Sequence, residues 1–131
     1  MIVLDTHAWI WWVSHPQSLS DRVKAALEQH AARRTVRVSS MSVWEVAQLV
    51  ARGRLELTMS VADWVARSEA LPLLEFVPVD NRIAIRSTQL PPPLPADPAD
   101  RIIVATAQVL GATLVTKDDR LRDYRHVETL W

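Results

Sequence analysis

Short apolar runs alternate with longer amphipathic segments along this sequence. Residues 2–4 (IVL) are uninterrupted apolar positions, which predict a buried strand ending at Asp5. Residues 35–40 alternate between polar and apolar positions, as a half-buried strand does. Pro78 indicates that the strand containing it lies near a sheet edge or a strand end. The other predicted strands cover residues 74–79, 112–116 and 126–131.

Helical periodicity accounts for five longer segments. Residues 20–34 have Ser20 as the predicted N-cap, and Val23, Ala26 and Leu27 share one face. A second helix is predicted to begin at its cap, Ser42, and to end at Gly53. Three more helices are predicted over residues 61–71, 80–90 and 98–111.

The order of these elements predicts the fold class. Short apolar strands that alternate with helices are typical of an α/β protein with a mostly parallel sheet, here of four to five strands, and helices on both faces. The proline-rich stretch 91–100 is a connector rather than a domain boundary, because too little chain follows it to fold alone. We therefore expect one domain over residues 1–131.

Composition narrows the functional classes. The chain has 131 residues, is 49% hydrophobic and contains no cysteine, which excludes disulfides, thiolate catalysis and cysteine zinc sites. Its two glycines exclude a glycine-rich phosphate loop. The formal net charge is zero, so a polyanion would have to be held by local arginines or through metal ions. No apolar run is long enough to cross a membrane and no signal peptide is evident, so we expect a cytoplasmic protein.

Acidic residues fall at corresponding points of several predicted elements. Asp5 follows the first strand, and Asp118 and Asp119 follow the strand at 112–116. Glu45 and Asp100 are expected in the first turns of their helices. Functional groups of open parallel sheets gather beyond the carboxyl ends of the strands, so these acids are predicted to converge. Clustered carboxylates repel one another, and a hard divalent cation, Mg²⁺ or Mn²⁺, would resolve that repulsion.

The chain resembles the PIN-domain ribonucleases, specifically the VapC-type toxins of type II toxin–antitoxin systems. The stretches that carry the resemblance are LDTHAWIWW, SSMSVWEVAQLVARGRLEL, DPADRIIVATAQ and LVTKDDRLRDY, in that order along essentially the whole chain. The resemblance implies a three-layer PIN-like fold and a metal-dependent endoribonuclease. It assigns the catalytic and metal-binding acids to Asp5, Glu45, Asp100 and Asp118, with Thr6 as a bordering hydroxyl.

The same resemblance implies the chemistry and the partners. A metal-activated water would hydrolyse RNA phosphodiester bonds and leave 5′-phosphate and 3′-hydroxyl ends. A homodimer and a small antitoxin protein that blocks the site are also implied. Ala96 stands where a histidine is common in this branch, and Ala99 stands where an aromatic residue is common. These two departures concern the fit of the substrate rather than the carboxylates.

Each acid also has a structural interpretation. Asp5 could cap a following helix, and Glu45 could form a capping box with Ser42, in which case its oxygens would face backbone N–H groups. Asp97 fits the N-cap of its helix, which leaves Asp100 for the metal. Asp118 and Asp119 point to opposite sides if the strand continues, and the motif favours Asp118.

Other residues and functional classes remain open at this point. Trp9, Trp11 and Trp12 could stack RNA bases, but the tryptophans are expected more often in the core or at an interface with a subunit or antitoxin. Arg101 is a candidate to orient Asp100, and the basic residues after Asp118 are candidates to hold phosphate. A phosphatase or phosphotransfer domain would need an aspartate where His7 stands, or an acceptor such as Asp80. A non-catalytic PIN-like binding module would keep the acids without a metal, at a cost in stability.

Overall fold

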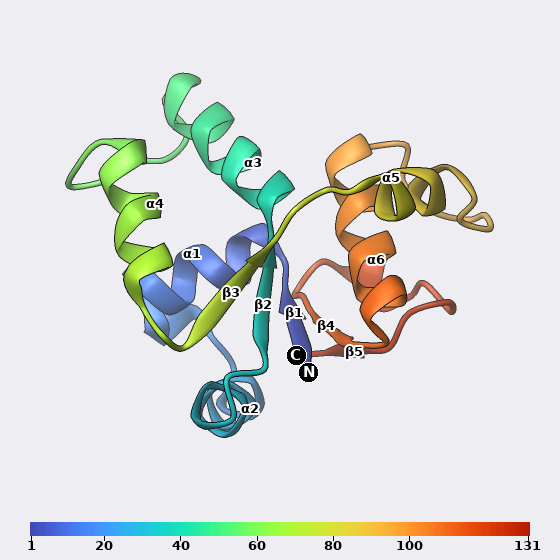
Figure 1. Ribbon diagram of the computed structural model, residues 1–131, viewed down its shortest axis with the longest axis horizontal. Coiled ribbons are helices and arrows are strands. Elements are labelled where there is room, and N and C mark those ends of the chain that lie inside the picture. Colours follow the sequence, from blue (N-terminus) through green and yellow to red (C-terminus); the bar gives the residue numbers. More distant parts are fainter.

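Five short strands form one parallel sheet in the computed structural model, which describes residues 1–131 (Figure 1). The strand order is β3-β2-β1-β4-β5, and every pairing is parallel. The predicted fold class is confirmed, and β3 with its following Pro78 is an edge strand, as expected. The strands are β1 (Ile2–Leu4), β2 (Val36–Ser39), β3 (Leu74–Val77), β4 (Thr113–Val115) and β5 (Thr129–Leu130).

Seven α-helices and one short 3₁₀ helix connect these strands. They are α1 (Thr6–Ser14), η1 (Pro16–Ser18), α2 (Asp21–Ala32), α3 (Ser40–Ala51), α4 (Val61–Ala70), α5 (Asn81–Thr88), α6 (Pro98–Leu110) and α7 (Asp119–Arg122). Ser20 caps α2 by accepting a hydrogen bond from the Val23 N–H at 3.1 Å, as predicted. None of these helices combines the length and the apolar character needed to cross a bilayer.

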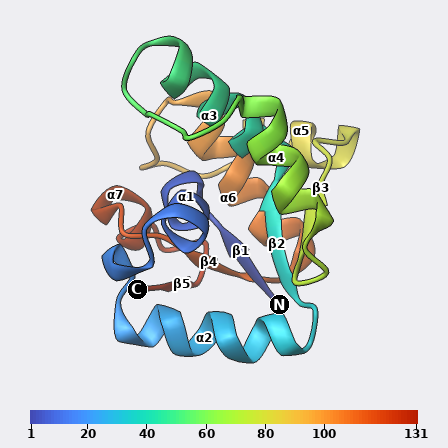
Figure 2. The ribbon, with the colours of Figure 1, turned by 90° about the vertical axis from the view of Figure 1, so that its left-hand side faces the viewer.

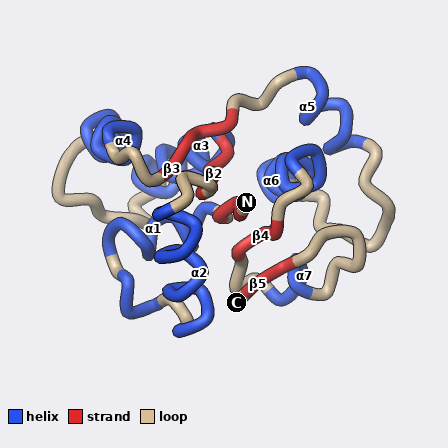
Figure 3. Tube along the Cα trace, turned by 60° about the horizontal axis from the view of Figure 1, so that its bottom comes forward, coloured by secondary structure: helices blue, strands red, loops and turns tan.

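The helices form a layer on each face of the sheet. Figures 1 and 3 show α1 and α4 on one side of the strands and α5 and α6 on the other. Figure 2 looks onto the layer that contains α1 and α4, with α6 behind the sheet. Side chains along β1 alternate accordingly, because Ile2 and Leu4 belong to one buried cluster and Val3 to the other. This is the three-layer arrangement expected from the alternating pattern.

Tryptophans organise the larger of the two cores. Trp9 is fully buried, and its ring lies 4.6 Å from that of Trp64 and 5.3 Å from that of Phe76. These contacts join α1, α4 and β3, so the apolar half of α1 is held against the sheet. Burying one such large side chain typically stabilises a fold by about 1.5–3 kcal/mol. The start of α1, directly after β1, is thereby fixed in position.

Parallel pairing brings the carboxyl ends of all strands to one edge of the sheet. Both α1 and α3 begin within two residues of a strand end, and the Asp5 N–H donates to the Val115 carbonyl at 3.0 Å. The N-terminal ends of α3 and α6 lie at this same edge, near the upper ends of the strands in Figure 1. Residues that are far apart in the sequence therefore become neighbours there.

Candidate active site

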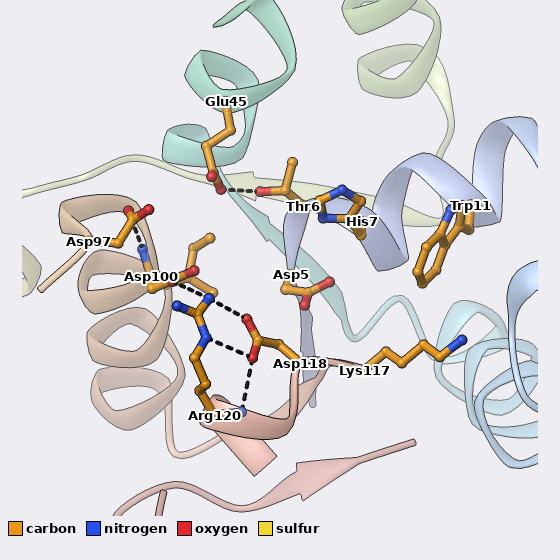
Figure 4. Close-up of a pocket in the computed structure, with 11 residues that line it drawn as sticks. Asp5, Thr6, His7, Trp11, Glu45, Asp97, Asp100, Lys117, Asp118 and Arg120 are labelled. Carbon is orange, nitrogen blue, oxygen red and sulfur yellow. Dashed lines mark hydrogen bonds and ion pairs between the residues drawn. The ribbon is translucent and has the colours of Figure 1, made fainter. Parts of the chain in front are cut away.

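The four predicted acids line a single pocket at the carboxyl edge of the sheet. The pocket has a volume of ≈ 480 Å³, and Figure 4 shows the acids entering it from β1, α3, α6 and the turn before α7. Its lining residues are Asp5, Thr6, His7, Trp11, Glu45, Asp97, Asp100, Ile103, Lys117, Asp118 and Arg120. Acids from four separate elements therefore border the same pocket.

Asp5 both caps a helix and lines the pocket. One of its oxygens, Oδ1, accepts a hydrogen bond from the Ala8 N–H at 2.8 Å, so Asp5 caps α1. The side chain also lines the pocket. Burial raises the pKa of Asp5 above its usual value, although hydrogen bonds from Thr116 and the Ala8 N–H act in the opposite direction. The cap therefore fixes the carboxylate at the end of β1 without removing it from the pocket.

Glu45 lies elsewhere on its helix than the sequence suggested. The capping-box interpretation is wrong, because α3 begins at Ser40 and its N-cap is Ser39, which accepts from the Met41 N–H at 3.1 Å. Glu45 thus sits in the second turn of α3, and its carboxylate is free of backbone contacts. Ser42 lies inside the helix, fully buried.

Two hydroxyl groups hold Glu45. Thr6 Oγ1 donates a hydrogen bond to Glu45 Oε1, and the Thr6 and Ser42 hydroxyls share another at 2.9 Å. Burial raises the pKa of Glu45, and the Thr6 hydrogen bond only partly offsets this. Thr6 and Ser42 are 4% and 0% exposed, so the carboxylate is supported from within the core.

Asp97 and Asp100 have different surroundings at the start of α6. Asp97 caps α6, and its Oδ1 accepts from the Ala99 N–H at 2.8 Å and from the Asp100 N–H at 3.4 Å. Asp100 occupies the third position of the helix and has a side chain that is 17% exposed. Burial raises the pKa of Asp100 to about 6, with further contributions from the nearby carboxylates of Asp97 and Glu45. This acid carries the clearest electrostatic cost in the pocket.

Asp118 and Asp119 point to different surroundings. The Asp118 side chain is 29% exposed and lines the pocket, whereas that of Asp119 is 88% exposed and pairs with Arg122 at 3.7 Å. Asp118 is the residue that caps α7, because its Oδ1 accepts from the Arg120 N–H at 2.9 Å. Its N–H donates to the buried hydroxyl of Thr116 at 3.1 Å, which connects the turn to the end of β4.

Arg120 neutralises one half of the pocket, a contact that the sequence did not reveal. Its Nη2 lies 2.7 Å from Asp118 Oδ2 and 3.6 Å from Asp100 Oδ2, and its Nε donates to Asp118 Oδ1 at 3.2 Å. The hydrogen bonds and charge of Arg120 lower the pKa of Asp118 below its usual value. The spacing of two residues between Asp118 and Arg120 was the only available signal. The bridge to Asp100 depends on the packing of α6 against β1 and β4.

Arg101 and Lys117 are the other two basic residues considered for the site. Arg101 does not orient Asp100, because its Nε donates to the Ser87 carbonyl at 3.1 Å and so ties α6 to α5. Lys117 lines the pocket with its Nζ 5.9 Å from the centre of the Trp11 ring. The rim of the pocket therefore carries two cations, Lys117 and Arg120, on the side of the last acid.

The donor set fits a hard divalent cation. All of the candidate ligands are carboxylate oxygens, and burial raises the pKa of three of them, so added positive charge would stabilise the group. No three His, Asp or Glu side chains converge closely enough in this arrangement to enclose an ion. Arg120 instead supplies positive charge to Asp100 and Asp118. Its side chain is 62% exposed and can withdraw without disturbing the core.

The family model described as PIN domain matches residues 2–127 of the chain. This chain belongs to the PIN domain family. Ribonuclease VapC22 of Mycobacterium tuberculosis (strain ATCC 25618 / H37Rv) is 37% identical to it over 132 residues, which cover 99% of this chain and 98% of the relative. The predicted family and fold are therefore confirmed.

Solved structures share the PIN fold over nearly their whole length. FitAcB from Neisseria gonorrhoeae is 26% identical with a TM-score of 0.70, covering 100% of this chain and 97% of that one. VapBC2 from Rickettsia felis, bound to a promoter DNA fragment, has a TM-score of 0.72 at 17% identity, covering 99% and 98%. A toxin–antitoxin complex from Klebsiella pneumoniae has a TM-score of 0.63 at 22% identity, covering 97% and 95%. The last two are alike in fold alone.

Proposed function

We propose that this PIN domain is a divalent-metal-dependent endoribonuclease and the toxin of a toxin–antitoxin pair. One observation carries the proposal: acids from four separate elements line one pocket in a chain that is 37% identical to Ribonuclease VapC22 over nearly its full length. Buried carboxylates with raised pKa values are typical of sites that bind a cation or move protons.

In this proposal, Asp5, Glu45, Asp100 and Asp118 are the metal-binding and catalytic acids. A bound Mg²⁺ or Mn²⁺ would activate water and offset charge on the phosphodiester. Asp5 is pre-positioned by its cap on α1, and Glu45 by the Thr6 hydroxyl. Arg120 would have to release Asp100 and Asp118, after which its guanidinium would be available to the phosphate backbone.

The organisation and partners of the domain belong to the same proposal. We take residues 1–131 as a single PIN domain, which is supported by the family match over residues 2–127. We include a small antitoxin partner in the proposal because the chain is 37% identical to Ribonuclease VapC22 and its fold also occurs in a toxin–antitoxin complex. A homodimer remains a prediction, as does the cytoplasmic location. No observation favours phosphotransfer, because Asp80 caps α5 and lies outside the pocket.

Replacing single acids of the pocket tests whether they are needed for RNA cleavage. Asp5→Asn and Asp118→Asn should each lower RNA cleavage by roughly 10³-fold or more, since several kcal/mol of metal-dependent stabilisation are lost. Asparagine is a good N-cap, so α1 and α7 should still form. Cleavage of total RNA is followed by gel analysis with Mg²⁺, Mn²⁺ or EDTA.

Asp119→Asn is the matched control, because Asp119 lies in the same turn but outside the pocket. It should cleave like the unmodified protein. Full cleavage in EDTA, or equal cleavage by Asp118→Asn and Asp119→Asn in protein free of contaminating nuclease, would contradict the proposal.

A further inference from the structure

A second groove continues from the acid pocket along one face of α3. It has a volume of ≈ 520 Å³ and shares Glu45 and Asp97 with the acid pocket. The remaining residues that line it are Met41, Trp44, Gln48, Leu49, Arg52, Arg54, Pro98 and Ala99. Most of the α3 residues among them recur every three or four positions, so they form a stripe that leads away from the acids. We call this feature the α3 groove.

Trp44 is the most exposed tryptophan of the chain, and it lines the α3 groove. Its side chain is 53% exposed, whereas Trp9 and Trp64 are 0% and 4% exposed in the core. Trp44 directly precedes Glu45 in α3, while Ser42 and Val46 on the other side of the helix are buried. The indole therefore projects from the helix beside the acid pocket, where it offers a flat apolar surface.

Two arginines extend the α3 groove beyond the tryptophan. Arg52 is the C-cap of α3 and Gly53, with φ 69°, reverses the chain, so Arg52 and Arg54 flank the turn. Neither guanidinium pairs with a carboxylate, unlike Arg37, Arg120 and Arg122. Trp44 and Arg52 are eight residues apart on α3, a separation of about 12 Å along the axis.

An exposed aromatic ring followed by unpaired cations is the usual composition of a single-stranded nucleic acid site. Bases stack on the ring irrespective of sequence, and the cations hold the backbone. This chain has no net charge, and its acid pocket repels phosphate unless a cation is bound. Affinity for RNA must therefore come from positive side chains next to the acids, as the α3 groove provides.

We infer that the α3 groove binds the single-stranded RNA segment adjoining the cleaved phosphate, with one base stacked on Trp44 and backbone phosphates against Arg52 and Arg54. This inference rests on the proposed nuclease function and deepens it, because it names the side from which substrate enters the site. It assigns Trp44 to substrate binding rather than to a contact between protein chains.

Binding of a defined RNA tests the inference. The probe is a 5′-fluorescein-labelled, mixed-sequence 12-nucleotide RNA, and the protein is the full chain carrying Asp5→Asn, in Mg²⁺, so that the probe stays intact. Fluorescence anisotropy gives the dissociation constant over a series of salt concentrations. Thermal unfolding of each variant by circular dichroism checks that it is folded.

Trp44→Ala should weaken binding by about tenfold, within the roughly 5- to 160-fold range of lost base stacking, and Trp44→Phe should retain most of the affinity. Binding should also quench tryptophan emission, and this quenching should fall in Trp44→Phe. Arg52→Ala and Arg54→Ala should each reduce the slope of log affinity against log salt by about 0.7, the value for one phosphate of a single strand.

Two exposed residues away from the α3 groove serve as matched controls. Ile85→Ala removes an apolar side chain that is 58% exposed on α5, and Arg22→Ala removes an exposed arginine on α2. Both should leave RNA affinity and its salt dependence unchanged.

Unchanged affinity in Trp44→Ala together with unchanged salt slopes in the arginine variants would overturn the inference. A shift from dimer to monomer in Trp44→Ala by light scattering, or loss of a co-purified antitoxin, with RNA affinity unchanged, would also overturn it in favour of a protein interface. Cleavage by the unmodified chain is measured separately. Absence of cleavage with RNA binding intact would contradict the nuclease function and leave the α3 groove as an RNA site.

Discussion

The two halves of the acid pocket are held by different kinds of group. On the β1–α3 side, Glu45 is held by the hydroxyl of Thr6 and Asp5 by the Ala8 N–H. On the α6–α7 side, Asp100 and Asp118 are bridged by the guanidinium of Arg120. The neutral donors supply no positive charge to the first pair of carboxylates, whereas the guanidinium supplies positive charge to the second pair.

The two halves of the pocket therefore differ in whether neutral hydrogen-bond donors or a positive charge hold the acids in place. Buried neutral donors fix where Asp5 and Glu45 lie whether or not a cation is present. The second pair depends on a positive charge, because burial and neighbouring carboxylates raise the pKa of Asp100 to about 6. In the proposed function, a divalent ion would therefore bind to a preformed half and replace Arg120 in the other half.

The largest expected effect comes from removing Asp100, an acid whose pKa is raised by burial and by neighbouring carboxylates. A rise in the pKa of Asp100 from 3.8 to about 6 means that the folded state binds its proton more tightly than the unfolded state. Stability is thus lost as the pH rises from about 4 through 6, by at most about 3 kcal/mol. In EDTA at pH 7, Asp100→Asn should be more stable than the unmodified chain, and the gain should vanish near pH 4.

Urea unfolding at several pH values measures this gain, with Asp119→Asn, in an 88% exposed position, as the control. Adding Mn²⁺ should raise the melting temperature of the unmodified chain more than that of Asp100→Asn, since the ion binds only the folded state. A gain that does not change with pH would contradict the electrostatic explanation.

An intermediate effect is expected from the hydroxyl-held half. Thr6→Val keeps the shape of the side chain but leaves the Glu45 carboxylate and the Ser42 hydroxyl without their partner. Single-turnover cleavage of labelled RNA should slow by about 10- to 100-fold, as is common when a residue supporting a metal ligand is lost. Thr6→Ser should restore most of the rate, and equal rates for Thr6→Val and the unmodified chain would show that Thr6 does not position Glu45.

The smallest expected effect concerns the guanidinium-held half. Arg120 is 62% exposed, so its ion pairs are worth only about 0.2–1 kcal/mol. Arg120→Gln should therefore tighten Mn²⁺ binding by about two- to fivefold in calorimetry, because the ion no longer competes with the arginine. Arg122→Gln, which removes an ion pair outside the pocket, should leave Mn²⁺ affinity unchanged. Weaker binding in Arg120→Gln would mean that Arg120 supports the ion instead of competing with it.

Local pattern predicted most of the elements but not all of their ends. Ser20 and Asp97 cap their helices as predicted, because a cap depends on a few consecutive residues. Ser42 was wrongly taken as the start of α3: Ser39, at the end of β2, is an equally good cap, and the packing of the β2–α3 junction selects it. The error mattered, because it made Glu45 a candidate for a capping box that does not exist.

Only those site residues that directly follow a strand could be placed from the sequence. Asp5 and Asp118 could be placed because parallel strands end at one edge. The hydroxyl support of Glu45 and the bridge from Arg120 to Asp100 could not, because each joins residues from elements distant in the sequence. The α3 groove was also missed, since the exposure of Trp44 depends on which face of α3 is covered.

The sequence by itself determined the five strands, five of the seven helices, the caps of several helices and the placement of Asp5, Asp100 and Asp118 at element ends, because these depend on local propensity and hydrophobic period. Only the tertiary structure decided that hydroxyls hold one pair of acids and an arginine the other, and that Trp44 stands uncovered beside them. Such contacts depend on the relative placement of elements, which is decided by the packing of both cores rather than by any one segment.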